Sequence, residues 1–95
     1  MKFNGALVKT STRVIGVAVV DKSFINKDPI LRAKYMQAYI QGFGGQTPVV
    51  LLLGDDAHMS ATENYWGRPD LVNQLKDIPL NYMTFKTWTA PDVEE

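Results

Sequence analysis

The residues best suited to chemistry lie together between positions 54 and 63. Asp55, Asp56 and Glu63 supply three carboxylates, and His58 is the one histidine in the 95 residues. Carboxylates beside an imidazole are suited to binding a divalent cation or to transferring protons. Turns also favour Asp, because its side chain bonds to nearby backbone N–H groups. The spacing matches no established ligand pattern, so we favour the turn and expect no metal site and no cofactor.

Large aromatic side chains with a polar tip form a second group of candidates. If Trp66 and Trp88 protrude, they would line a ligand pocket or a partner interface. A small domain needs large side chains to complete its core, so we favour a core role for this group. Its members are Tyr35, Tyr39, Tyr65, Trp66, Tyr82 and Trp88.

Arg68 precedes Pro69 and Asp70 at the expected start of a helix. A helix N-terminus is able to hold an anion, and arginine adds a bidentate contact to a carboxylate or phosphate. The same guanidinium is able to pair with Asp70, Asp55 or Asp56 of its own chain. We favour that internal pair.

Composition and charge exclude several classes of protein. Ten basic and ten acidic residues balance, so no strong field attracts nucleic acid or an anionic membrane. The absence of cysteine excludes disulfides and thiolate sites. The longest apolar runs, 17–20 and 49–53, fall far short of the ~20 residues of a spanning helix, and no signal peptide is recognised. We therefore expect a cytoplasmic protein without a nucleic-acid or membrane partner.

The first half of the chain predicts a β-hairpin and a helix. Residues 2–9 and 13–20 are expected to be strands, the second of them rich in β-branched side chains, and the short polar turn between them predicts a hairpin. Asp28 suits an N-cap and Pro29 the first helical position, so a helix is expected over 28–42. The glycines of the Gly42-Phe43-Gly44-Gly45 run are expected to end that helix.

The second half predicts another hairpin, another helix and a closing strand. Val49–Leu53 is apolar throughout, which is typical of a strand in the middle of a sheet that is covered on both faces. Residues 62–66 are expected to return beside it. A helix then begins at Pro69 and ends before Pro79. Alternation over 81–89 predicts the last strand, and 90–95 are expected to form a frayed acidic tail.

These elements define one domain over residues 1–95. We expect an α+β fold in which a two-layer arrangement joins a mixed or antiparallel sheet of about five strands to two helices. The expected order is β-β-α-β-β-α-β.

One segment carries a resemblance. Residues 48–75, PVVLLLGDDAHMSATENYWGRPDLVNQL, resemble a pattern of small uncharacterised bacterial proteins. In that pattern an apolar strand ends in an acidic turn, a short aromatic strand follows, and Gly-Arg-Pro/Lys-Asp opens a helix. The preceding unit, GVAVVDKSFINKDPILRAKYMQAYIQGFGG, has a similar layout. The resemblance implies a shared fold and no activity or site residue.

Two hypotheses about function follow. The first is a non-enzymatic binding or protein-interaction module that forms a homodimer, because a doubly apolar strand needs cover on both faces and two-fold dimers are common. The chain's own two helices are the alternative cover. The second is a small-molecule-binding protein or minor enzyme with a site at loop 54–63 and the start of the second helix. Its ligand-binding residues would be Asp55, Asp56, His58, Trp66, Arg68 and Tyr39.

Overall fold

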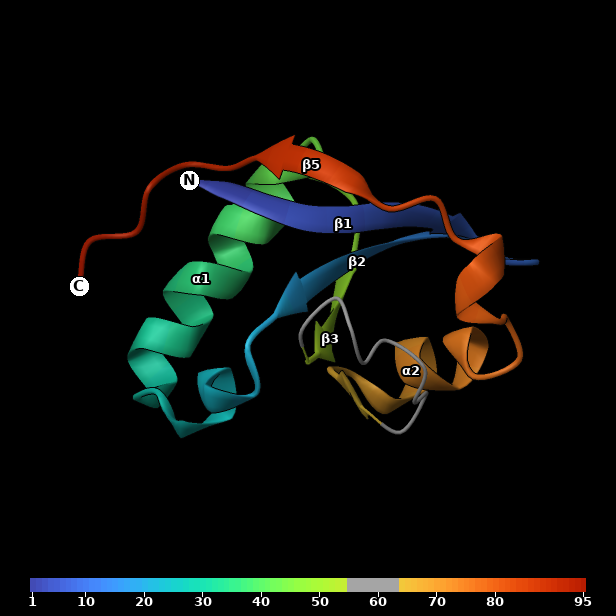
Figure 1. Ribbon diagram of the computed structural model, residues 1–95, viewed down its shortest axis with the longest axis horizontal. Helices are drawn as coiled ribbons and strands as arrows, with labels where there is room; N and C mark the ends of the chain where they lie inside the picture. The colour runs from blue at the N-terminus through green and yellow to red at the C-terminus, as the bar shows by residue number, and fades with distance from the viewer. Residues whose placement is uncertain (55–63) are drawn as a thin grey trace.

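The computed structural model describes residues 1–54 and 64–95 and contains five strands and two α-helices (Figure 1). In these ranges, the 3-10 helix Lys22–Asn26 precedes the first α-helix and the 3-10 helix Leu80–Tyr82 precedes the last strand. The order β-β-α-β-β-α-β and the α+β class confirm the sequence prediction. The elements are β1 (Lys2–Lys9), β2 (Val14–Val20), α1 (Pro29–Gly42), β3 (Val49–Leu53), β4 (Tyr65–Trp66), α2 (Pro69–Leu75) and β5 (Lys86–Thr89).

The five strands form one mixed sheet in the order β4-β3-β2-β1-β5. Strands β1 and β2 form the predicted hairpin, and β3 and β4 pair antiparallel as expected. Strand β3 runs parallel to β2 and lies second from the edge, so the prediction that it is the middle strand is wrong. The central strand is β2, because β5 pairs with the outer side of β1 and moves the first hairpin inward.

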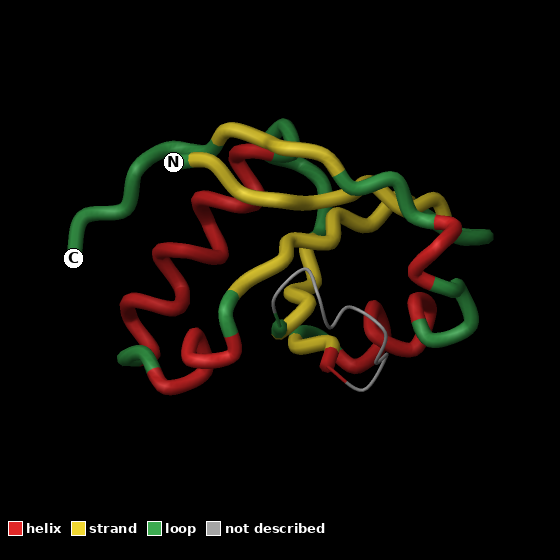
Figure 2. Tube along the Cα trace, viewed as in Figure 1, coloured by secondary structure: helices red, strands yellow, loops and turns green. Residues whose placement is uncertain are grey.

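The two α-helices cover opposite faces of the sheet. Along β3, Val49 and Leu51 join a buried cluster that includes Ala38 and Tyr39 of α1. Val50 and Leu52 join a second cluster that includes α2 residues. Figures 1 and 2 show the two helices on either side of β3. The expected two-layer arrangement is therefore corrected to three layers, helix, sheet and helix, because consecutive residues of a strand face opposite sides.

Both faces of β3 are thus covered by this chain itself. The same residues that predict a doubly covered strand, Val50, Leu51 and Leu52, are at most 1% exposed. The covered strand removes the main reason for expecting a second subunit.

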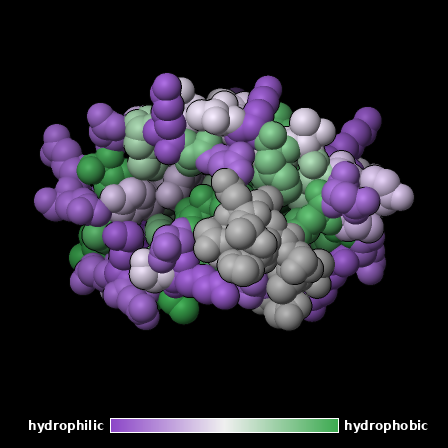
Figure 3. Space-filling model, in the orientation of Figure 1, coloured by the Kyte–Doolittle hydropathy of each residue, from purple (hydrophilic) through white to green (hydrophobic). Residues whose placement is uncertain are grey.

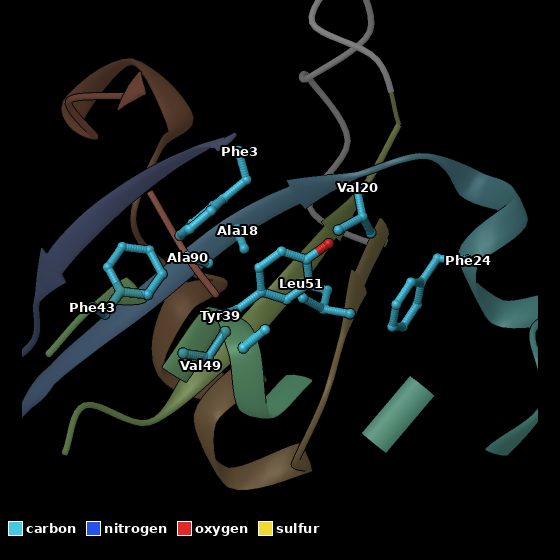
Figure 4. Packing of buried hydrophobic residues seen from close by; sticks show 10 residues of the cluster. Phe3, Ala18, Val20, Phe24, Tyr39, Phe43, Val49, Leu51 and Ala90 are labelled. Carbon is cyan, nitrogen blue, oxygen red and sulfur yellow. The ribbon is translucent and has the colours of Figure 1, made fainter. Parts of the chain in front are cut away.

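The cluster under α1 combines aromatic rings with aliphatic side chains (Figure 4). The Phe3 ring meets Tyr39 and Phe43 edge to face, with centroid distances of 5.0 and 5.3 Å. The Phe43 ring also lies over two glycines of the hairpin, where a Cβ atom would come within 2.9 Å of it at Gly5 and within 2.6 Å at Gly16. The glycines inside these strands therefore make room for a ring.

Helix α1 begins and ends as its sequence predicts. The Asp28 carboxylate accepts a hydrogen bond of 2.8 Å from the backbone N–H of Ile30, and Pro29 occupies the first turn. At the other end, Gly45 donates to the carbonyl of Ile40, and Gly44, with a positive φ of 107°, donates to that of Gln41. These two bonds form a Schellman stop, so the glycine run serves as a helix C-terminus.

The chain's end differs from the prediction. Strand β5 begins only at Lys86, because Met83 is instead buried in the α2 cluster, where the Tyr65 hydroxyl donates to its sulfur at 3.6 Å. Within the predicted tail, Ala90 is 5% exposed and the Tyr35 hydroxyl donates to Glu95 at 2.5 Å. Among the described residues, no helix is long and apolar enough to cross a membrane.

Candidate functional site

The predicted site residues fall into two groups. Asp55, Asp56 and His58 lie outside the described residues. The structure places the other three, Tyr39, Trp66 and Arg68. Trp66 and Arg68 line a common pocket, whereas Tyr39 lies in the core beneath α1.

The pocket has a volume of about 670 Å³ and lies between α1 and the segment from Trp66 to Leu71. Apolar side chains make most of its surface, and two arginines are the charged members of its lining. Hydrophilic side chains project around the outline of the face drawn in Figure 3, and apolar atoms show between them near its middle. The lining residues are Pro29, Arg32, Ala33, Met36, Ile40, Pro48, Val49, Trp66, Gly67, Arg68 and Leu71.

One wall of the pocket is a stripe of α1. Arg32, Met36 and Ile40 recur every four residues, so they share one side of the helix, next to Ala33. The neighbouring side carries the buried core residues Ala38 and Tyr39. The apolar side of α1 is therefore wider than the part that packs on the sheet, and the remaining apolar side chains, Met36 and Ile40, face the pocket.

The opposite wall is fixed by β4. Strand pairing sets Trp66 opposite Leu51, and the Trp66 ring meets the Phe24 ring edge to face with centroids 6.0 Å apart. The Arg32 guanidinium carbon lies 5.8 Å from the centre of the Trp66 ring, within cation–π range. Trp66 is thus held between Phe24 and Arg32 and has little freedom to collapse into the pocket.

The two arginines of the pocket have different partners. Arg68 donates through Nε and Nη2 to the two carboxylate oxygens of Asp70, at 3.2 and 2.9 Å, which confirms the favoured internal pair. Both side chains are at least half exposed, so this pair is weakly stabilising. Arg32 donates through Nη1 to the backbone carbonyl of Ile25 at 2.7 Å. A neutral carbonyl positions that guanidinium without neutralising its charge.

Tyr39 contributes to the core and not to this pocket. Its ring packs against Phe3 and lies 6.4 Å from that of Tyr35. Burial raises the pKa of the Tyr39 hydroxyl to about 12, with a smaller contribution from Tyr35. Burial alone raises the pKa of Tyr65, on the other face of the sheet, to about 12 as well.

These raised pKa values predict a loss of stability in alkali. The folded protein holds the Tyr39 proton up to about pH 12, whereas the unfolded chain releases it near pH 10, so stability falls as the pH rises between these values. After allowance for solvent near the hydroxyl, we expect Tyr39 to contribute about 1–2 kcal/mol to that loss. Urea unfolding on both sides of this interval should show that Tyr39→Phe loses less stability than the wild type. Tyr82→Phe, at a side chain 77% exposed, is the control and should lose as much as the wild type; equal losses in all three proteins would contradict the prediction.

Gly54 lies at the opposite end of β3 from the pocket. The backbone N–H of Gly54 donates to the carbonyl of Val20, beyond the carboxyl end of β3, whereas the pocket includes Pro48 and Val49 at the amino end. At ~3.3 Å per residue these two ends are about 16 Å apart. Trp66 and Arg68 therefore share their pocket with residues of α1 and with the start of β3.

Sequence reasoning missed the α1 side of the pocket. None of Arg32, Met36 and Ile40 is among the predicted ligand-binding residues, although all three line the pocket. The available signal was the width of the apolar arc, because a helix that covers one sheet needs a narrower stripe.

No protein-family model, curated protein or solved structure matches this chain. The resemblance of residues 48–75 to bacterial proteins therefore stays a prediction. The case for function depends on the geometry of the pocket.

Proposed function

We propose that this domain is a non-enzymatic binding module that holds a small apolar molecule in the pocket between α1 and Trp66–Leu71. The supporting observation is the pocket itself. Its volume of about 670 Å³ falls within the range of about 300–1,000 Å³ that is typical of small-molecule sites. Its lining is mostly apolar with a few polar groups, as in such sites.

The chemistry of the lining favours binding over catalysis. Its ionisable side chains are Arg32 and Arg68, and arginine stays protonated and donates hydrogen bonds only. The rest of the lining consists of apolar side chains, a glycine and one indole. General acid–base or nucleophilic chemistry needs a group that exchanges a proton or attacks a substrate. Such a group is absent from the part of the lining that the structure describes.

The walls support a pocket that is present before a ligand arrives. Ile40 and Met36 project from a helix of 14 residues, and Val49 belongs to a strand whose neighbours are buried. Met36 adds adaptability, because a flexible thioether side chain adjusts to ligands of different shape. Preformed apolar sites on rigid elements bind with a small ordering cost.

A second copy of the chain is the competing occupant of this surface. The sequence favours a homodimer because β3 needs two covers, but α1 and α2 supply both. The homodimer stays a prediction of the sequence. Sedimentation at high micromolar concentration tests it, and a monomer would leave the pocket open to a small molecule.

Filling part of the pocket should weaken the binding of an apolar probe. Ala33 is an exposed residue of the lining, so Ala33→Phe adds a ring to the pocket without entering the core. We expect 1-octanol to bind the wild type and to bind Ala33→Phe about tenfold more weakly, since overfilling a site costs about 1–3 kcal/mol. Heteronuclear NMR titration measures both affinities and shows that each protein is folded.

Ile30→Phe is the matched control. Ile30 lies on the same helix, is 71% exposed and is not part of the pocket. This variant should bind 1-octanol as the wild type does. Equal binding by all three proteins would place the probe elsewhere and refute the proposed site, and failure of the wild type to bind would refute the proposed function.

A further inference from the structure

We infer that the ligand of this pocket is a monocarboxylate with a medium-length apolar body, and that Arg32 binds its carboxylate. This inference rests on the proposed function, since it names the class of ligand for the same pocket. It is argued from charge, from the way in which Arg32 is held and from the length of the apolar lining.

The charge of the lining favours an anion. The chain as a whole is neutral, with ten basic and ten acidic residues, yet two guanidinium groups and no carboxylate line the pocket within the described residues. An apolar ligand with a negatively charged end matches this lining in both respects. A cation would meet the like charge of the Arg32 guanidinium, which disfavours binding.

Arg32 is the better placed of the two guanidinium groups. One of its N–H groups is held by the Ile25 carbonyl at 2.7 Å, and its guanidinium lies over the Trp66 ring. A guanidinium has five N–H donors, so an anchor on one of them leaves others for a carboxylate. Because the Ile25 carbonyl is neutral, the positive charge of Arg32 is also left for the ligand. The side chain is therefore positioned before the ligand binds, which lowers the cost of binding.

Arg68 is expected to contribute less than Arg32 to binding the carboxylate. Its fork of donors is already used by Asp70 in a bidentate pair. Within the described residues one uncompensated guanidinium thus lines the pocket, and its single charge matches a monoanion. A dianionic phosphate would need both arginines and the release of Asp70.

The apolar lining sets the size of the ligand. From Arg32 to Ile40 the helix advances eight residues, which is about 12 Å at ~1.5 Å per residue. Met36 and Ile40 line that length from α1, while Val49 and Leu71 line it from the other side. A carboxylate at Arg32 would therefore direct a medium-chain aliphatic body along the helix toward Ile40. Octanoate is a suitable probe of this class, and 1-octanol is its neutral counterpart.

The test compares octanoate, 1-octanol and octyl phosphate on the wild type and two arginine variants, by NMR titration at low ionic strength. A charge-assisted hydrogen bond is worth about 1.5–3 kcal/mol, so octanoate should bind the wild type roughly tenfold or more tightly than 1-octanol. Arg32→Gln should remove that preference, so that this variant binds octanoate no more tightly than 1-octanol. Arg68→Gln should change the preference for octanoate over 1-octanol by about twofold at most, since exposed ion pairs contribute little.

Three outcomes would overturn the inference while the proposed function stands. They are equal affinities of the wild type for octanoate and 1-octanol, a preference for octanoate that survives Arg32→Gln, and tighter binding of octyl phosphate than of octanoate. Failure of the wild type to bind any of the three probes would overturn the proposed function as well.

Discussion

Leu51→Ala and Leu52→Ala should each lower the free energy of unfolding by about 3 kcal/mol, because removal of a buried leucine side chain leaves a cavity. Leu51 is 0% and Leu52 is 1% exposed, and they belong to the two separate clusters on opposite faces of the sheet. A comparable loss at both positions is expected only if both faces of β3 are packed. Urea unfolding of the two variants beside the wild type measures the losses.

The same measurement tests whether this chain covers both faces without a partner. Leu53→Ala, at a partly buried position at the end of the same strand, is the control and should cost less, about 1 kcal/mol. The unfolding midpoint should not change with protein concentration. A midpoint that rises with concentration would show that a second subunit completes the core. A loss below 1 kcal/mol at Leu51 or Leu52 would show that its face is not packed.

Gly16→Ala should destabilise the protein by about 2 kcal/mol, which is the usual cost of overpacking a core. A Cβ at this position would lie 2.6 Å from one carbon of the Phe43 ring and 2.8 Å from another, and the nearest atoms all belong to that ring. Phe43 is 7% exposed and is packed against both Phe3 and Trp88, so it has little room to move. Thermal or urea unfolding gives the size of the loss.

A second substitution separates a clash with the ring from a general intolerance of alanine in the strand. Phe43→Leu removes the ring, so Gly16→Ala should cost clearly less in that background, by about 1 kcal/mol or more. Gly5→Ala is the contrasting case, because its Cβ would also meet the backbone carbonyl oxygen of Val17 at 2.9 Å. Phe43→Leu should therefore rescue Gly16→Ala better than Gly5→Ala. Equal rescue at the two positions would contradict this interpretation of the hairpin glycines.

Local chemistry made much of the fold predictable. Asp28 and Pro29 mark the start of α1, where the Asp28 side chain accepts from Ile30, and Gly44 and Gly45 donate the two hydrogen bonds that end it. The unbroken apolar run of β3 predicts a strand that is covered on both faces, and that cover is present. In these cases the signal lies within a few residues of the structure that it predicts.

The features that the sequence missed depend on contacts between distant segments. Nothing near Lys86 reveals that β5 pairs with β1 and makes β2 the central strand. Alternation at Met83 indicates a strand, but burial of that side chain beside Tyr65 ends the pattern before pairing begins. A local periodicity shows which side of a segment is apolar, but it does not show which distant segment packs against that side.

The candidate site shows the same division. Trp66 and Arg68 are recognisable from their residue types, and they line the pocket. Arg32 and Met36 join them only because α1 packs on the sheet face that carries Val49 and Leu51, which no local pattern encodes. The segment 55–63, where the sequence concentrates its ionisable groups, lies outside the described residues.

The most direct test of a ligand site in this pocket is to locate bound 1-octanol in the wild-type protein by NMR. Chemical-shift changes should concentrate on the Met36 and Ile40 methyl groups and on the Trp66 indole, which line the pocket. The methyl groups of Leu75 and Val8, in the cluster on the other face, should not respond. Changes centred on that cluster, or no saturable change at all, would contradict a ligand site between α1 and Trp66–Leu71.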